Sequence, residues 1–273
     1  MIHYHTYPHK ESKEWVAFIH GAGGSSSIWF KQLKYFKSKY NVLLVDLRGH
    51  GKSKFPLFKK LRSYNFKIIR EDVLEVLNQL NIESAHFVGI SLGTIIIRDL
   101  AENNPERVKS MILGGAVMKL NLRGQLLMRL GNWFKSMLPY MILYKLFAWV
   151  ILPRRKHKES RNLFVREAKK LDQGEFKKWF ALVSEINPLL RFFRINGSEV
   201  PSLYIMGEED YMFLPSVKKL VSEQKNTALE VLPNCGHVVN IDCPQLFNEL
   251  SSRFIQQFQY KNLDNVKYQT ALS

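Results

Sequence analysis

Short, nearly unbroken runs of apolar residues recur along the chain at the length of a β-strand. They span residues 16–20, 42–46, 85–90, 110–115, 202–206 and 228–232. Segments with apolar residues at helical spacing lie between and after them, at 28–38, 66–80, 92–102, 216–223 and 244–257. Strands that are apolar on both sides and alternate with helices are typical of a parallel sheet covered by helices on both faces. The pattern therefore predicts an α/β fold.

The alternation stops between residues 118 and 196, where helical segments follow one another and no strand-like run occurs. We therefore expect a core made of residues 1–117 and 197–273, with a helical cap inserted at 118–196. The cap holds 17 Lys or Arg and 5 Asp or Glu, so it carries 12 of the 16 net positive charges of the chain. It also holds three of the five tryptophans, at positions 133, 149 and 179.

The basic cap leaves three interpretations open. Its Lys and Arg residues can form the solvated side of amphipathic helices whose apolar side covers a site. Aromatic and basic residues on the same helices also suit an anionic membrane surface or a lipid, which would place the protein peripherally at a membrane. Net charge alone gives only non-specific attraction to nucleic acid, and the chain shows no recognised nucleic-acid-binding motif, so no specific nucleic-acid partner is expected.

Composition and segment lengths bound the class of protein. The chain has 273 residues, of which 46% are hydrophobic and 23% charged, as in a folded globular protein and unlike a disordered one. The N-terminus lacks the apolar stretch of a signal peptide, and the longest apolar run, 140–152, is too short to span a bilayer and contains Lys145. Only Cys235 and Cys243 could pair. We therefore expect a cytoplasmic protein with reduced thiols.

The clearest chemical motif is Gly89-Ile90-Ser91-Leu92-Gly93, placed between a predicted strand and a predicted helix. A strand-to-helix turn this sharp strains its central residue and tolerates only very small side chains two positions to either side. The Ser91 hydroxyl would then stand above the sheet edge at a helix N-terminus, where negative charge is favoured. The motif predicts a serine nucleophile.

A serine nucleophile needs a general base and an acid that orients the base. Two loops that directly follow predicted strands supply His237 as the base and Glu208, Glu209 or Asp210 as the acid, and Asp242, further along the chain, is a fourth candidate acid. In open α/β sheets, ligands gather at the carboxyl ends of the strands. The order serine, acid, histidine matches that of α/β-hydrolases.

An acyl-transfer site also needs two donors for the oxyanion. The turn His20-Gly21-Ala22-Gly23-Gly24 follows a predicted strand, and its glycines allow backbone N–H groups to approach a ligand. The backbone N–H groups of Ala22 and Leu92 are therefore the candidates for an oxyanion hole. Asp46, Arg48 and His50, at the end of another strand, are expected to shape their loop by hydrogen bonds rather than to act in catalysis.

These motifs, together with the segment 46–53, resemble the successive signatures of the α/β-hydrolase superfamily from about residue 16 to residue 258. The resemblance implies that Ala22 and Leu92 form the oxyanion hole, that the helical cap follows the sixth strand, and that Asp210 is the acid. One departure is the short N-terminus, where residues 1–7 leave room for only one of the family's first two strands. Haloalkane dehalogenases and epoxide hydrolases of this fold have Asp where this chain has Ser91, so their chemistries are excluded.

The sequence thus predicts a serine hydrolase with the catalytic residues Ser91, Asp210 and His237, acting on a small-molecule carboxylic ester with an apolar acyl or alkyl group. No cofactor or metal is expected. The resemblance leaves other serine-dependent activities open, namely a thioesterase, a cofactor-free lyase and a haloperoxidase-like enzyme. A non-catalytic small-molecule receptor with the same fold is a further alternative.

Overall fold

The computed structural model describes residues 1–54, 63–119 and 139–270, with side chains up to residue 258 apart from 183–185. Seven strands form one sheet in the order β1-β3-β2-β4-β5-β6-β7. β1 is antiparallel to β3 and all other neighbours are parallel. The strands are β1 Tyr4–Tyr7, β2 Trp15–Ile19, β3 Asn41–Val45, β4 Ala85–Ile90, β5 Val108–Gly114, β6 Ser202–Gly207 and β7 Thr227–Leu232.

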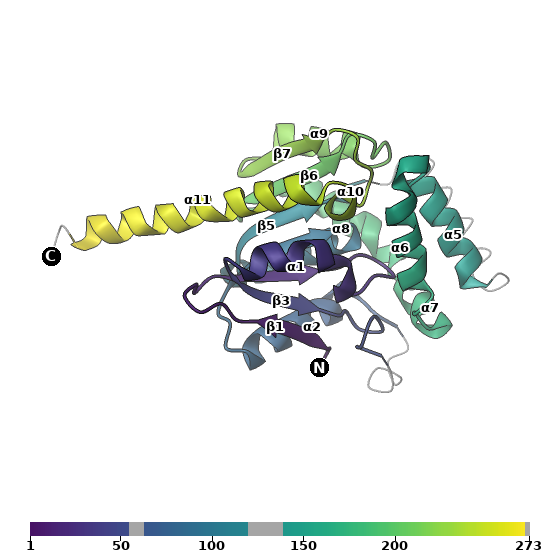
Figure 1. Ribbon diagram of the computed structural model, residues 1–273, viewed down its shortest axis with the longest axis horizontal. Helices are drawn as coiled ribbons and strands as arrows, with labels where there is room; N and C mark the ends of the chain where they lie inside the picture. Colours follow the sequence, from purple (N-terminus) through teal and green to yellow (C-terminus); the bar gives the residue numbers. More distant parts are fainter. Residues whose placement is uncertain (55–62, 120–138, 271–273) are drawn as a thin grey trace.

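Helices cover both faces of this sheet (Figure 1). Apolar residues of α2, α3 and α9 pack on one face, and those of η1, α1, α10 and α11 pack on the other. The helices of these two layers are η1 Ser26–Trp29, α1 Phe30–Lys37, α2 Phe66–Gln79, α3 Leu92–Asn103, η2 Pro105–Arg107, α9 Leu214–Glu223, α10 Val239–Asp242 and α11 Pro244–Thr270. The predicted fold, a mostly parallel sheet flanked by helices, is confirmed.

Between β5 and β6 the described chain is helical. The helices are α5 Tyr140–Ile151, η3 Arg155–His157, α6 Lys158–Ala168, α7 Gln173–Ala181 and α8 Val183–Ile195, here called the α5–α8 insertion. In Figure 1, α5, α6 and α7 lie together at one end of the sheet. Of the cap expected at 118–196, residues 120–138 lie outside the described residues. In the part of the chain that is described, no helix is both long and apolar enough to cross a membrane.

The first strand and the last helix can be compared with the elements that the sequence predicted at the two ends of the chain. One strand, β1, precedes β2, as the short N-terminus predicted. The apolar spacing predicted a last helix at 244–257, but α11 continues to Thr270 and extends away from the sheet (Figure 1). The sequence after Gln257 contains no glycine or proline that would end a helix, which accounts for the difference.

Candidate active site

Ser91 lies at the predicted sharp turn, directly between β4 and α3. Its φ is 53°, a conformation rare for residues other than glycine. A Cβ atom on Gly93 would collide with the carbonyl oxygen of Ile19, and one on Gly89 would lie 3.0 Å from the backbone of Gly93. Both glycines are therefore required by the close approach of α3 to β4 and β2, as the sequence predicted.

Ser91, His237 and Asp210 are brought together from three separate strand ends. Nε2 of His237 lies 2.9 Å from Oγ of Ser91. Nδ1 of the same ring lies 2.7 Å from Oδ2 of Asp210. Asp210 and His237 are almost fully buried, and the ring of Phe213 lies 5.0 Å from the imidazole, centroid to centroid. A base held in this way at both nitrogens has a fixed orientation toward the serine.

The other candidate acids are engaged elsewhere. Glu208 is exposed and accepts a hydrogen bond of 3.3 Å from the backbone N–H of Asn234. Glu209 forms ion pairs with residues of the α5–α8 insertion. Asp242 accepts a hydrogen bond of 2.9 Å from the backbone N–H of Gly236. Of the four carboxylates considered, Asp210 is the one that the structure places on His237.

Ala22 and Leu92 lie beside Ser91 in the wall of the same cavity. Leu92 is the first residue of α3, so its N–H has no acceptor within the helix. Within the described residues, no hydrogen bond of either backbone N–H is present. A Cβ on Gly21 would lie 3.2 Å from Cβ of Ser91, so the turn that carries Ala22 reaches the serine closely because Gly21 has no side chain.

The loop after β3 supports this turn through Asp46 and His50. The Asp46 carboxylate accepts backbone hydrogen bonds from Ser26 at 2.7 Å and Lys52 at 2.8 Å. Burial would raise the pKa of Asp46, but these donors hold it below its ordinary value. Nε2 of His50 accepts a hydrogen bond of 3.0 Å from the N–H of Gly23. Burial, and next the charge of His20, lower the pKa of His50 to about 3, so the imidazole is neutral and can accept this bond.

Arg48, the third residue of this loop, forms a bidentate ion pair with Asp72, with both N···O distances at 2.6 Å. The predicted role of Asp46, Arg48 and His50 in shaping the loop is therefore confirmed.

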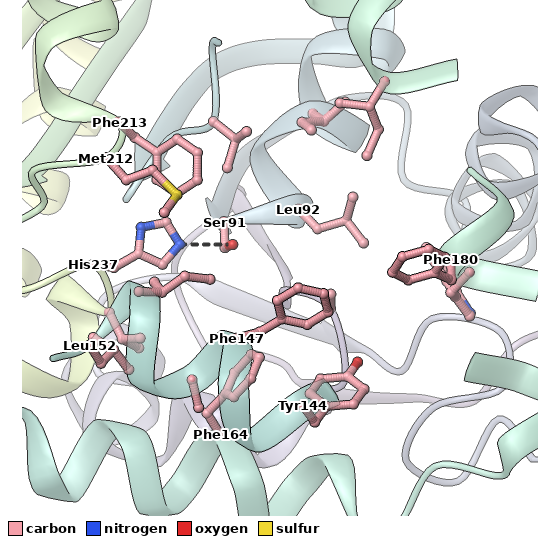
Figure 2. A pocket seen from close by; sticks show the side chains of 18 of the residues that line it. Ser91, Leu92, Tyr144, Phe147, Leu152, Phe164, Phe180, Met212, Phe213 and His237 are labelled. Carbon is pink, nitrogen blue, oxygen red and sulfur yellow. Dashed lines mark hydrogen bonds between the residues drawn. The ribbon is translucent and has the colours of Figure 1, made fainter. Parts of the chain in front are cut away.

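An apolar cavity of about 200 Å³ opens at Ser91 and His237 (Figure 2). Core residues form one part of its wall and the α5–α8 insertion forms the other. The insertion contributes Tyr144, Phe147, Ala148, Ile151, Leu152, Phe164, Phe176, Trp179, Phe180 and Ile186. A second, smaller cavity shares Ala22, Ser91 and His237 and extends past Gly21, Ser160 and Glu167. The nucleophile candidate thus stands between two spaces of different size.

The sequence did not identify these lining residues. Their aromatic side chains come from different helices of the insertion and meet only after the helices fold over the sheet. The available signal was the concentration of aromatic and apolar residues in the segment, which indicates an apolar surface but not which side of each helix faces the site.

The α5–α8 insertion is tied to the loops that carry Asp210 and His237. Glu209 lies 2.5 Å from Nη1 of Arg154 and 3.0 Å from Nε2 of His157, and it also pairs with Lys156. Ser160 donates a hydrogen bond to one carboxylate oxygen of Asp242. The other oxygen accepts one from the backbone N–H of Gly236, directly before His237. The loop of Asp210 is therefore supported by residues directly before α6, and the loop of His237 by Ser160 in the first turn of α6.

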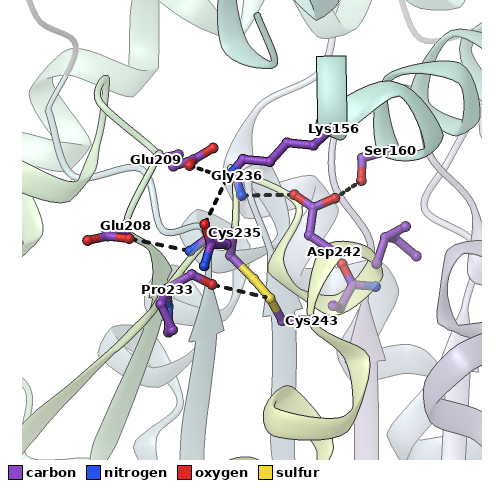
Figure 3. Close-up of a disulfide and its surroundings, with 12 residues drawn as sticks. Lys156, Ser160, Glu208, Glu209, Pro233, Cys235, Gly236, Asp242 and Cys243 are labelled. Carbon is purple, nitrogen blue, oxygen red and sulfur yellow. Dashed lines mark hydrogen bonds and ion pairs between the residues drawn. A yellow bond between two sulfur atoms is a disulfide. The ribbon is translucent and has the colours of Figure 1, made fainter. Parts of the chain in front are cut away.

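A disulfide joins Cys235 to Cys243, with the Cα atoms 6.3 Å apart (Figure 3). The sequence led us to expect reduced thiols, and the structure corrects this expectation. α10 lies between the two cysteines and returns the chain to within bonding distance, which spacing along the sequence does not reveal. The disulfide encloses Gly236 and His237.

In the described part of the chain, no group of three or more His, Cys, Asp or Glu side chains lies close enough to hold a metal ion.

A sheet with this strand order, a serine at a strained strand-to-helix turn and a histidine and acid on later strand ends together define the α/β-hydrolase class. The family model described as the alpha/beta hydrolase fold matches residues 14–244. The chain belongs to this family.

Relatives of known sequence and structure cover most of the chain. It is 26% identical to 3-oxoadipate enol-lactonase 2 of Acinetobacter baylyi over 89% of each chain. It is 25% identical to the uncharacterized carboxylesterase nap of Bacillus subtilis, over 88% of this chain and 78% of that one. The crystal structure of the enol-lactonase from Burkholderia xenovorans LB400 superposes with a TM-score of 0.77 at 20% identity, over 93% of this chain and 96% of that one.

Proposed function

We propose that the protein is a serine hydrolase that cleaves a carboxylic ester with an apolar acyl or alkyl group. The observation that carries the proposal is the chain of contacts from Ser91 to His237 to Asp210, at 2.9 and 2.7 Å, opening into an apolar cavity. Relatives named as lactonases and a carboxylesterase support the same reaction type, because both cleave a bond between an acyl carbon and an oxygen.

In the proposed reaction, His237 removes the proton of the Ser91 hydroxyl as its oxygen attacks the ester carbonyl. Asp210 holds the imidazole in the tautomer that can accept this proton and stabilises the imidazolium that forms. The N–H groups of Ala22 and Leu92 donate hydrogen bonds to the oxyanion. The imidazolium then protonates the leaving alcohol, and an acyl-enzyme remains on Ser91. Water, deprotonated by His237, releases the acid.

An ester has two arms, and the two cavities that share Ser91 and His237 provide space for both. The larger one is lined almost entirely by apolar and aromatic side chains, so it suits a hydrocarbon chain. We assign the apolar arm of the substrate to this cavity. In this proposal the α5–α8 insertion acts as the cap that forms the cavity and sets the accepted chain length.

The direct test is hydrolysis of p-nitrophenyl esters from acetyl to palmitoyl by the wild type and by Ser91→Ala. We expect turnover by the wild type, with a preference for an acyl chain longer than acetyl. Ser91→Ala should lose at least about 10³-fold in kcat while its thermal unfolding stays unchanged. Turnover retained by Ser91→Ala would disprove the role of the serine.

A cavity variant tests where the hydrocarbon arm binds. Ala148 is buried on α5 and lines the larger cavity, so Ala148→Phe should fill part of it and move the preference to shorter chains. The activity on the acetyl ester should persist, which separates a change of cavity size from loss of the catalytic groups. An unchanged chain-length profile in a folded Ala148→Phe variant would rule out this cavity as the acyl site.

Other activities of the fold give different results in the same experiments. Labelling of Ser91 by a fluorophosphonate without turnover of any ester would favour a narrow-substrate enzyme or a lyase, whose products come from elimination instead of hydrolysis. Ligand-induced thermal stabilisation with neither turnover nor labelling would favour a receptor.

A further inference from the structure

The outer side of α5 exposes large apolar side chains. Ile142 is 50% exposed, Leu146 is 44% exposed and Trp149 is 62% exposed. Their spacing places them along one stripe of the helix. Leu143, Tyr144 and Ala148, on the other side of α5, are buried. Burying the outer stripe would remove apolar area from water, so this surface is suited to an apolar partner.

Basic side chains lie beside Trp149, at one end of this stripe. An open groove beside Trp149 is lined by Lys145 of α5 and by residues of α6 and its C-cap. These are Arg161, Asn162, Val165, Arg166 and Lys169. Among the described residues that line this groove, none is acidic. We call the three apolar residues together with Lys145, Arg161, Arg166 and Lys169 the outer patch.

The charges of the outer patch are compensated only in part. Arg161 donates hydrogen bonds to the backbone oxygens of Leu152 and Arg154. Of the acids of α6, Glu159 pairs with Lys31, and the buried Glu167 accepts a hydrogen bond from Ser25 and pairs with Lys170. Arg166 lies 3.7 Å from Glu167. Within the described residues, neither Lys145 nor Lys169 forms an ion pair. The patch therefore carries positive charge available to an external anion.

From this combination we propose that the outer patch docks onto a lipid bilayer that contains anionic headgroups. Exposed Trp, Leu and Ile enter the boundary between headgroups and acyl chains, while Lys and Arg contact the phosphates. A bilayer accounts for both observations, because it offers an apolar layer directly beneath a layer of negative charge. A folded acidic protein or a nucleic acid would match the charge but leave the apolar stripe without a reason.

The position of α5 makes this docking relevant to the site. The outer side of the helix carries the patch, and its inner side supplies Tyr144, Phe147 and Ala148 to the larger cavity. A single layer of helix thus separates the proposed lipid contact from the proposed acyl site. The docking itself needs no chemistry at Ser91, so it can be tested independently of the proposed function.

The experiment is co-sedimentation of the full chain with vesicles of phosphatidylcholine alone and of phosphatidylcholine with about one-third phosphatidylglycerol. We expect binding to the anionic vesicles, weakened by high salt, and much less binding to the neutral ones. Lys145→Gln/Lys169→Gln should weaken partitioning about 30-fold, the loss expected for two basic residues at such a surface. Trp149→Gln should weaken it about tenfold through lost apolar burial.

A matched control removes the same charge elsewhere. Lys34→Gln/Lys37→Gln changes two exposed lysines on α1, outside the insertion, and should leave binding nearly unchanged. Ser91→Ala should bind as the wild type does. The thermal unfolding of each variant shows whether the fold is kept, because every substituted side chain of the patch is exposed.

Three results would overturn the proposal. The first is no binding of the wild type to anionic vesicles at low salt. The second is an equal loss of vesicle binding in the α1 control and in the Lys145→Gln/Lys169→Gln variant, which would show that binding depends on net charge and not on the outer patch. The third is a dimer in solution that Trp149→Gln dissociates, which would make a second copy of the chain the occupant of the patch.

Discussion

The carboxylate of Glu209 lies 3.0 Å from Nε2 of His157. Glu209 directly precedes Asp210, the acid that contacts His237. His157 is almost fully buried, and Arg154 and Lys156 approach the same carboxylate from the rim. The loop that carries the acid is thereby attached to η3 and to Arg154, directly before α6. Two adjacent residues of this loop thus contact different parts of the protein: Glu209 contacts the α5–α8 insertion and Asp210 contacts the imidazole of His237.

Replacing Glu209 by Gln should therefore lower stability, because the variant leaves the buried His157 and two cations without their shared anion. We expect a loss of about 1–3 kcal/mol in the free energy of unfolding. Urea denaturation measures it. Glu208→Gln is the matched control, since Glu208 is exposed, and it should change stability by less than about 0.5 kcal/mol. Equal effects of the two substitutions would contradict a specific role for the ion pairs.

Asp210→Asn should reduce kcat about 10⁴-fold while the variant stays folded, because an amide can hold the imidazole in the wrong tautomer. The measurement is steady-state hydrolysis of the best p-nitrophenyl ester. Asp242→Asn serves for comparison, as Asp242 binds the backbone of Gly236 and not the imidazole. It should cost far less activity. A larger loss in Asp242→Asn than in Asp210→Asn would reassign the acid.

Gly93→Ala should destabilise the protein by about 3 kcal/mol and impair Ser91, because the new Cβ would meet two backbone oxygens of β2 and its loop. Backbone atoms within a sheet cannot move aside cheaply. Gly197→Ala provides the control, since a Cβ there meets nothing within 4 Å. Thermal and urea unfolding of both variants decide the point, and a neutral Gly93→Ala would show that the turn can relax.

Mild acid should weaken the fold through His50. Burial lowers its pKa from the ordinary 6.5 to about 3 in the folded protein, so below pH 6.5 the unfolded chain takes up a proton that the folded chain does not. Stability is then lost as the pH falls from 6.5 toward 3, by about 1 kcal/mol at pH 5.5.

Urea unfolding across this range tests the expectation. His50→Asn should show a smaller loss with acidification, and part of the remainder should come from His20 and His5, whose pKa values burial also lowers. An identical pH dependence in wild type and His50→Asn would exclude His50 as a source.

The sequence predicted the sheet well because its buried strands are short, continuous apolar runs. The predicted strand at 85–90 coincides with β4, and the one at 110–115 overlaps β5, which begins two residues earlier. The need for glycine on either side of Ser91 could also be predicted, because it arises from the geometry of the turn itself. His237 followed from its place after a strand, whereas Asp210 was chosen from four candidate acids through the resemblance to the α/β-hydrolase superfamily.

Features that depend on contacts between distant segments were missed. Glu209 was one of the four candidate acids, but its carboxylate is buried where Arg154, Lys156 and His157, all before α6, approach it from the insertion. The disulfide depends on the path of α10, and the cavity wall depends on how the helices of the α5–α8 insertion pack above the end of the sheet. No pattern of residues within a single segment encodes these arrangements.

The pairing of β5 with β6 aligns Met111 with Ser202, across the whole α5–α8 insertion. The serine belongs to the chain before this junction, and the acid and the histidine belong to the chain after it. Closing such a long loop is slow compared with forming helices or neighbouring strands. During refolding, ester hydrolysis should therefore return later than helical circular dichroism, as the last property of the molecule to recover.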